Sequence, residues 1–315
     1  MRRVNRFATI FIALCVAGAG ANAQNDCKKP LYLTFDTGHM GVAQLIADVL
    51  RREQVPVTFF AAHERTQEGD GSLGEHWAPW WAARAAEGHA FASHTWSHAY
   101  WRADASASAD AGANPAKGSG DNRSSIGSVG GTGTGTGTGS GAAFVLQPSA
   151  GPRAGERFTA SAADYCAEIR QAADRLRTLT GQAPLPLWRA PGGKTSPALL
   201  AAGRACGFAH VGWSPAGFLG DELPSESASN AQLLQKALRD VRPGDILMAH
   251  LGIWSRRDPW ASAVLQPLLQ GLKAQGFCFR TLREHPQWRD WIAAHPVEPR
   301  GAGAAPGAPS VEGRK

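Results

Sequence analysis

The chain has 315 residues, of which 43% are hydrophobic and 18% are charged, and its formal net charge is +6. This length suffices for one large domain or two small ones, and the composition excludes a disordered or fully membrane-embedded chain. The basic residues form no clustered stripe, so we expect no nucleic acid among the partners.

The first predicted element is a leader that does not belong to the fold. Three arginines within the first six residues precede an apolar run from Phe7 to Ala19, and Ala21 and Ala23 provide small residues for signal peptidase cleavage. The run is shorter than the roughly 20 residues that span a bilayer, although a retained anchor is the alternative. We therefore predict a signal peptide over residues 1–23, a periplasmic or secreted protein, and no stable membrane span after cleavage.

Removal of the leader changes the charge and the cysteine count. Its three arginines have no acidic counterpart, so the net charge falls from +6 to +3. The four remaining cysteines are Cys27, Cys166, Cys206 and Cys278. An exported protein can form one or two disulfides from them, and buried free thiols are the alternative. Their wide spacing argues against a structural zinc site.

Beyond the leader, short β-branched or aromatic runs alternate with longer amphipathic stretches. Strands are expected at 31–35, 55–60, 89–93, 186–189, 209–213, 245–250 and 277–281. Helices are expected at 42–50, 77–87, 162–179, 197–206, 231–240 and 261–275. This alternation implies parallel strands joined by right-handed crossovers. No glycine-rich dinucleotide motif follows any strand, so we predict an α/β fold with a nearly closed barrel and not an open doubly wound sheet.

The pattern stops between residues 103 and 143, where Ala, Ser, Gly and Asp dominate and a Thr-Gly repeat runs from Thr132 to Gly139. Such a composition buries too little apolar area to offset the entropy of ordering. We predict a disordered insertion here, within a single domain formed by residues 24–102 and 144–295. A disordered tail is expected over 296–315.

Polar residues recur at the ends of the predicted strands, where a parallel barrel gathers its chemistry. They are Asp36, His94 with His98, Arg189, Trp213 with Ser214, and His250. The spacing of His94 and His98 would place both imidazoles on one side of a helical turn, where they could share a metal ion. Each residue taken singly also has a structural interpretation. The histidines could be surface or capping residues, Asp36 could be a helix N-cap, and a tryptophan could belong to the core.

Five motifs, taken in this order, resemble the polysaccharide deacetylase family, also called the NodB homology domain or carbohydrate esterase family 4. They are Thr-Phe-Asp-Thr-Gly from Thr34, the Val-Thr-Phe-Phe strand from Val57, Gly-His-Ala-Phe-Ala-Ser-His-Thr-Trp-Ser-His from Gly88, Arg-Ala-Pro-Gly-Gly from Arg189, and Leu-Met-Ala-His from Leu247. The resemblance covers roughly residues 30–283 apart from the insertion. It implies a distorted (β/α)7 barrel, which agrees with the strand count.

The resemblance also implies roles for individual residues. Asp36 matches the general base, His250 the general acid, and Arg189 the arginine that orients the base. His94 and His98 match the two metal-binding histidines, and Pro191 and Gly192 the groove wall. We add Trp213 as a substrate-binding residue, because aromatic faces stack on sugar rings. The implied cofactor is a divalent metal ion, zinc first and nickel or cobalt next, and it is expected to be weakly held.

Position 37 departs from the family pattern. A second aspartate usually stands there as the third metal ligand, and here it is Thr37. Thr37 could coordinate weakly or through water, His39 could replace it, or the metal could be held loosely or lost. The aspartates that tune the catalytic histidine are also missing beside Trp213, and Asp221 follows only later, so that role stays unassigned.

The resulting hypothesis is an exported hydrolase of non-peptide carbon–nitrogen bonds. It would remove N-acetyl groups from peptidoglycan, poly-N-acetylglucosamine or a chitin-like glycan. In this reaction a metal ion would activate the water, and an acid would protonate the departing amine. The alternatives are a hydrolase of a small non-sugar amide and a carbohydrate-binding pseudoenzyme with a lost or weak metal site. The particular glycan, the metal and the oligomeric state are left open.

Overall fold

Seven parallel strands form the centre of the molecule, at the places that the sequence pattern predicts. The computed structural model describes residues 27–105 and 141–299. Within them the strands are β1 (Pro30–Asp36), β2 (Thr58–Ala61), β3 (Ala90–Ser93), β7 (Leu187–Trp188), β8 (Ala209–His210), β9 (Ile246–His250) and β10 (Cys278–Phe279). They pair in the order β10-β1-β2-β3-β7-β8, and β9 pairs with β1. All of these pairs are parallel.

Loop backbone completes the ring between β8 and β9. In the described residues these two strands share no ladder, and the segment 214–219 lies against β9 instead. The N–H of Met248 donates to the carbonyl of Gly217 at 2.8 Å, and the N–H of Leu219 donates to the carbonyl of Met248 at 3.2 Å. The predicted α/β class and distorted (β/α)7 barrel are therefore confirmed.

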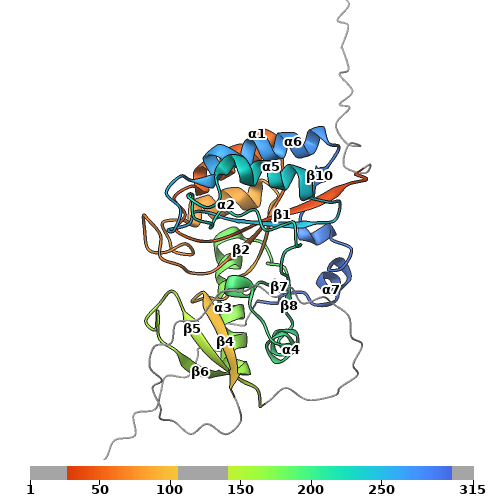
Figure 1. Cartoon of the computed structure of the whole chain (residues 1–315). Helices are drawn as coiled ribbons and strands as arrows, with labels where there is room; N and C mark the ends of the chain where they lie inside the picture. Colours follow the sequence, from red (N-terminus) through yellow and green to blue (C-terminus); the bar gives the residue numbers. More distant parts are fainter. Residues whose placement is uncertain (1–26, 106–140, 300–315) are drawn as a thin grey trace, which may run out of the picture.

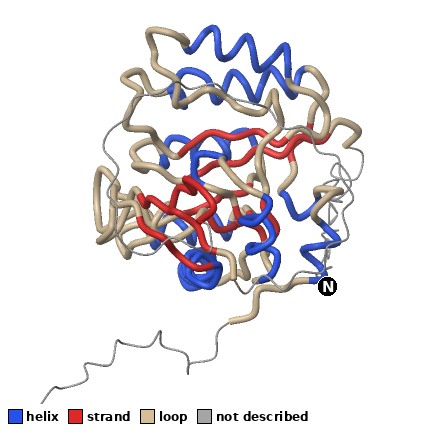
Figure 2. Tube along the Cα trace, turned by 60° about the horizontal axis from the view of Figure 1, so that its bottom comes forward, coloured by secondary structure: helices blue, strands red, loops and turns tan. Residues whose placement is uncertain are grey.

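Helices surround this strand layer (Figures 1 and 2). They are α1 (Ala43–Glu53), α2 (Ala78–Ala86), α3 (Ala162–Thr180), α4 (Pro197–Ala205), α5 (Asn230–Asp240), α6 (Gln266–Ala274) and α7 (Arg289–Ala294), with a π-helical turn at Ala261–Leu265 before α6. The long α3 shows why its ends lie where they do. Ser161 and Asp164 form a reciprocal capping box at its start, and Gly181 adopts φ +67° at its end.

The central strands are buried on both faces, as expected when helices cover a parallel sheet. Every residue of β2 and β3 is buried. Phe59 of β2 lies among the rings of Trp80 and Trp81 from α2, with centroids 5.5 and 5.8 Å away. This packing fixes the middle of the sheet, so the carboxyl ends of β1, β2 and β3 are held in register.

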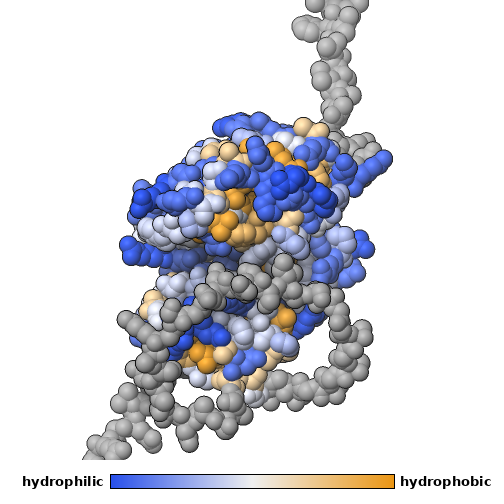
Figure 3. Space-filling view, viewed as in Figure 1, coloured by the Kyte–Doolittle hydropathy of each residue, from blue (hydrophilic) through white to orange (hydrophobic). Residues whose placement is uncertain are grey.

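The outer face of α1, α5 and α6 carries mostly hydrophilic side chains with smaller apolar areas between them (Figure 3). Among the described residues, no helix is both long and apolar enough to cross a membrane. The predicted leader over 1–23 lies outside the described residues.

A small antiparallel sheet was not predicted from the sequence. It consists of β4 (Ala99–Ala105), β5 (Ala143–Pro148) and β6 (Phe158–Ser161) in the order β4-β5-β6. Residues 103–105 and 143 thus lie in strands, and the prediction of disorder for them was wrong. Phe144 and Leu146 of β5 are buried beside α3, and this contact with a distant segment supplies the ordering energy that local composition lacks.

The rest of the predicted insertion, 106–140, lies outside the described residues, as does 300–315. At the start of the predicted tail, Val297 packs against the cluster around α3 and accepts a hydrogen bond from Arg177. The folded domain therefore extends beyond residue 295. Helix α7 was also missed, since six residues are too few to show a clear period.

All four cysteines of the described chain are paired in two disulfides. Cys27 is bonded to Cys278 at the start of β10, and Cys166 of α3 is bonded to Cys206 after α4. The first bond ties the beginning of the domain to its last strand. The second ties two neighbouring helices.

Replacing Cys166 and Cys206 with alanine is expected to lower the free energy of unfolding by about 4 kcal/mol, because the bond closes a loop of about 40 residues in the unfolded chain. Urea denaturation of oxidised protein would measure the loss. In reductant the native protein and the variant should unfold at nearly the same urea concentration, which serves as the control. Equal midpoints under oxidising conditions would contradict the prediction.

Candidate active site

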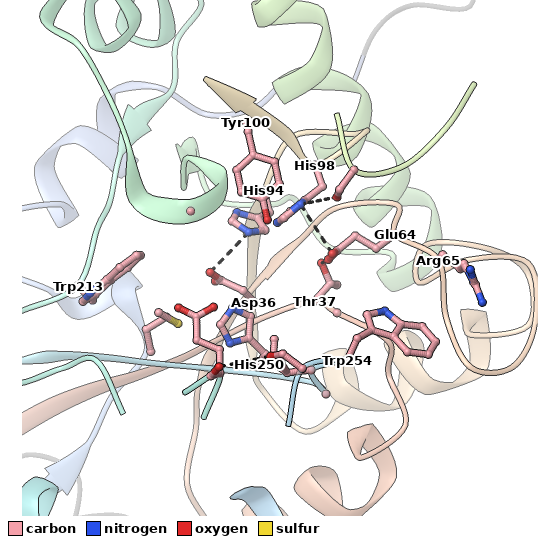
Figure 4. Close-up of a pocket in the computed structure, with 18 residues that line it drawn as sticks. Asp36, Thr37, Glu64, Arg65, His94, His98, Tyr100, Trp213, His250 and Trp254 are labelled. Atoms are coloured by element: carbon pink, nitrogen blue, oxygen red, sulfur yellow. Dashed lines mark hydrogen bonds and ion pairs between the residues drawn. The ribbon is translucent and has the colours of Figure 1, made fainter. Parts of the chain in front are cut away.

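The carboxyl ends of three strands bring distant polar residues to one cavity. Asp36 at the end of β1 is directly opposite His250 at the end of β9, and β1 is in register with β2 on its other side. A cavity of about 540 Å³ opens at this end of the barrel (Figure 4). Its lining includes Asp36, Thr37, His94, His98, Gly192, Trp213 and His250. The structure therefore brings together residues that the sequence separates by more than 200 positions.

Asp36 is held by a buried arginine. Nη1 of Arg189 donates to Oδ1 of Asp36 at 2.6 Å and to Oγ1 of Thr34 at 2.9 Å. Nε and Nη2 of the same guanidinium donate to the carbonyls of Val211 and Gly212 at 3.1 and 3.0 Å. With four hydrogen bonds from a fully buried group, Arg189 has little freedom, so the Asp36 carboxylate is fixed as well.

The charges around Asp36 keep it ionised. Burial alone would raise the pKa of this carboxyl group, but the charges of Arg189 and His250 and the hydrogen bond from Arg189 outweigh it, so the pKa lies below its usual value. At neutral pH Asp36 is therefore a carboxylate that can accept a proton.

His94 presents one defined nitrogen to the cavity. Its Nδ1 lies 3.0 Å from the carbonyl oxygen of Arg189, and a carbonyl only accepts, so Nδ1 carries the proton. Nε2 then has the lone pair and lies 3.6 Å from Oδ2 of Asp36. Burial lowers the pKa of His94 to about 4, so the ring is neutral at physiological pH. A neutral ring oriented in this way is suited to metal ligation.

His98 lies beside His94, with ring centroids 4.8 Å apart. The expected helical turn between them is wrong, because residues 94–98 form a non-helical bend in which Thr95 and His98 have φ of +63° and +50°. Oγ1 of Thr95 accepts the N–H of Ala99 and closes this bend. Nδ1 of His98 is 2.7 Å from Oγ of Ser149. The bend, and not helical periodicity, turns both rings to one side.

His250 is paired with an acidic residue that the sequence analysis left unassigned. Its Nδ1 lies 3.1 Å from both carboxylate oxygens of Asp221, and its backbone N–H donates to the same carboxylate at 2.7 Å. Burial alone would lower the pKa of His250, but the charge and hydrogen bond of Asp221, with contributions from Asp36 and Glu222, raise it to about 10. His250 is therefore protonated at neutral pH. Asp221 follows Trp213 by eight residues in a Gly-Asp-Glu sequence, and this local sequence alone only weakly indicates a partner for His250.

Thr37 and His39 both face partners other than the two histidines. Oγ1 of Thr37 donates to Oε2 of Glu64 at 2.5 Å and accepts the N–H of Ala62 at 3.0 Å. His39 accepts the N–H of Gly41 through Nδ1 and lines a neighbouring cavity of about 260 Å³. Glu64 lines the main cavity and was not singled out in the sequence.

The remaining predicted residues form one wall of the cavity. Pro191 is buried in the 3-10 turn Pro191–Gly193, whereas Gly192 and Trp213 line the cavity. Gly192 has φ +67°, and a Cβ there would come within 2.9 Å of the ring of Tyr100, so this position requires glycine. Tyr100 and Trp254 also line the cavity, and Trp254 is 58% exposed at its edge.

The donor types present fit a divalent ion of the zinc kind in part. His94 and His98 provide two imidazoles whose Nδ1 atoms are both occupied by hydrogen bonds. In the part of the chain that the structure describes, no three His, Cys, Asp or Glu side chains are gathered closely enough to hold an ion as they stand. Two imidazoles could thus serve as ligands, and a third donor would have to come from a neighbouring side chain.

Replacing Asp221 with Asn is expected to move the alkaline limb of the kcat/KM profile to lower pH. The Asp221 charge raises the pKa of His250 to about 10, whereas burial alone would lower it. In the general-acid role that the sequence predicts for His250, function is lost as pH rises through this pKa, so the variant should lose activity at a lower pH although Asp36 and Glu222 still face the ring. Asp290→Asn, on the exposed face of α7, is the control. An unchanged alkaline limb would contradict the assignment of His250.

Comparison with known sequences gives a family match over most of the described barrel. The profile of the family described as polysaccharide deacetylase matches residues 23–211, more than half of the chain. An uncharacterized 30.6 kDa protein of Geobacillus stearothermophilus is 23% identical over 256 residues, covering 81% of this chain and 70% of that protein.

Solved structures share the fold at low identity. A family 4 acetyl xylan esterase from Clostridium thermocellum, in complex with a cobalt ion, matches with a TM-score of 0.53 and 19% identity, covering 83% of this chain and 92% of that one. The Bc1960 peptidoglycan N-acetylglucosamine deacetylase matches with a TM-score of 0.52 and 20% identity, over 82% and 88% of the two chains. A family 4 pseudoenzyme from Bacillus anthracis has a TM-score of 0.50 and 14% identity, over 82% and 65%. These likenesses concern the fold alone, but the family profile goes further: the chain belongs to the polysaccharide deacetylase family.

Proposed function

We propose that this protein is an exported N-deacetylase of an amino-sugar polymer such as peptidoglycan, poly-N-acetylglucosamine or a chitin-like glycan. The observation that carries the proposal is that Asp36 and His250, register partners on neighbouring strands, line one cavity. The first is kept ionised by Arg189, and the second is kept protonated by Asp221. A base and an acid with separated pKa values are what amide hydrolysis requires.

Asp36 would remove the proton from the attacking water, since its carboxylate is fixed and ionised. Arg189 would hold Asp36 in the orientation for this transfer. His250 would donate its proton to the departing nitrogen, because an amide anion is too poor a leaving group. A divalent ion held by His94 and His98 would polarise the acetyl carbonyl and acidify the water.

The cavity walls suit a sugar. Trp213, Tyr100 and Trp254 supply aromatic surface around the reacting groups, and aromatic faces pack against the apolar faces of pyranose rings. The exposed position of Trp254 at the edge leaves room for a neighbouring sugar unit of a polymer.

An oxidising compartment is supported by the two disulfides, which persist outside the cytoplasm. The apolar leader with its alanine cleavage site points the same way. We therefore place the mature protein in the periplasm or outside the cell.

The test is acetate release from a panel of N-acetylated glycans and one small non-sugar amide by the purified, metal-supplemented protein. Release from a glycan, with less from the small amide, supports the proposal. A pseudoenzyme that binds glycans is the second candidate, favoured by Thr37 at the position of the usual aspartate. Glycan binding without acetate release would establish that candidate instead.

A further inference from the structure

We propose that Glu64 supplies the carboxylate of the metal site, in the role that a second aspartate at position 37 has elsewhere in the family, and that Thr37 positions it. This inference rests on the proposed deacetylase function, because it names the third donor for the divalent ion of that site. Glu64 comes from the loop after β2, which adjoins the end of β1 (Figure 4).

The hydroxyl of Thr37 is committed to holding Glu64. It donates to Oε2 of Glu64 at 2.5 Å, and the N–H of Ala62 donates to the same hydroxyl oxygen at 3.0 Å. The backbone N–H of Thr37 donates to the carbonyl of Phe60 at 3.1 Å, so position 37 and the loop after β2 form one unit. Where the family usually has an aspartate, this chain thus has a threonine with a carboxylate bonded to it.

The backbone of Glu64 is fixed by a buried serine. Its N–H donates to Oγ of Ser72 at 2.9 Å, and the N–H of Ser72 donates to the carbonyl of Glu64 at 2.9 Å. Oγ of Ser72 donates in turn to the carbonyl of Ala62 at 2.5 Å. Ser72 is fully buried, so these bonds do not compete with water. The side chain of Glu64 therefore starts from a defined point on the cavity wall.

The Glu64 carboxylate lies beside His98, one of the two imidazoles. Oε1 of Glu64 is 3.8 Å from Nδ1 of His98, and the Glu64 side chain is 16% exposed. Within residues 27–105 and 141–299, no lysine or arginine forms an ion pair with it. The Thr37 hydroxyl and the His98 ring meet its charge in part, and a divalent cation shared with His94 and His98 would compensate it further.

The first experiment measures zinc affinity directly, without an activity assay. Metal-free protein is titrated with Zn²⁺ against a competing chelator. Glu64→Gln keeps the size and the hydrogen bond of the side chain but removes its charge, and we expect zinc binding to weaken about a hundredfold. Glu68→Gln, the same change on an exposed glutamate of the same loop, should bind zinc within twofold of the native protein.

A rescue variant separates a metal role from a folding role. Thr37→Asp combined with Glu64→Gln restores the carboxylate at the position where the family usually has it, and we expect most of the zinc affinity to return. Zinc affinity of Glu64→Gln within threefold of the native protein would overturn the proposal, and so would failure of the added aspartate to recover it in a folded double variant.

X-ray absorption at the zinc edge distinguishes a ligand from a residue that only orients His98. The native protein should show two imidazole ligands, and Glu64→His should show three. Two imidazoles in zinc-loaded Glu64→His would mean that residue 64 does not reach the ion, and the proposal would fall. If zinc binds as proposed but no glycan releases acetate, the proposed function fails while the metal site stands.

Discussion

Replacing His250 with Ala is expected to lower kcat for an N-acetylated glycan about a thousandfold, with KM changed little. The imidazolium that Asp221 stabilises is the proposed proton source for the leaving nitrogen, because a guanidinium such as that of Arg189 beside Asp36 does not give up its proton. Steady-state acetate release measures the effect. His76→Ala, at an exposed histidine outside the cavity, is the matched control.

An activated substrate sharpens this test. An aryl acetate has a leaving group that departs without a proton, so His250→Ala should reduce its hydrolysis far less than it reduces glycan deacetylation. Equal losses on both substrates would show that His250 acts by holding the site together, and the acid role would have to be abandoned.

Replacing Asp36 with Asn is expected to reduce kcat by about a thousandfold as well, for a different reason. The amide keeps the shape but cannot take a proton from water at neutral pH. This loss should extend to the aryl acetate, because the attacking water still needs a base. The two variants therefore differ in their response to the leaving group, which assigns the two roles independently.

The same substitution carries a stability cost. Arg189 is fully buried, and its charge would lose its carboxylate partner. Removal of one member of a buried pair costs about 3–5 kcal/mol, so Asp36→Asn should unfold at clearly lower urea concentration. Asp48→Asn, which disturbs only exposed contacts with Arg51 and Gln44 on α1, should unfold like the native protein. Full activity in Asp36→Asn would remove Asp36 from the mechanism.

Local sequence patterns determined the elements and the places where polar residues interrupt them. The strand that ends at Asp36 and the one that ends at His250 are readable because a buried parallel strand is a continuous apolar run, and the first polar residue after it marks its end. The convergence of these ends then follows from the handedness of the crossovers. For the same reason the barrel could be predicted before any coordinates were known.

Two features of the fold could not be predicted from local sequence patterns. Residues 103–105 and 143 have the composition of the predicted insertion, yet they belong to a sheet in which Phe144 and Leu146 pack beside α3. The bend at Thr95 and His98 has left-handed backbone angles that no periodicity signals. Both features depend on α3, where the carbonyl and carboxylate of Glu168 accept the N–H groups of Trp96 and Ser97 in the bend.

The sequence by itself determined the barrel, its alternation of strands and helices, and the identity of the base, the acid and the two histidines as candidates. Only the tertiary structure decided that Asp221 partners His250, that Cys166 joins Cys206, and that Thr37 holds Glu64. Periodicity reports which face of an element is buried, because burial repeats along the chain. The three pairs join single side chains 27 to 40 positions apart, and one contact of this kind produces no repeating pattern in the sequence. Such a contact forms only because folding brings two separate segments close together.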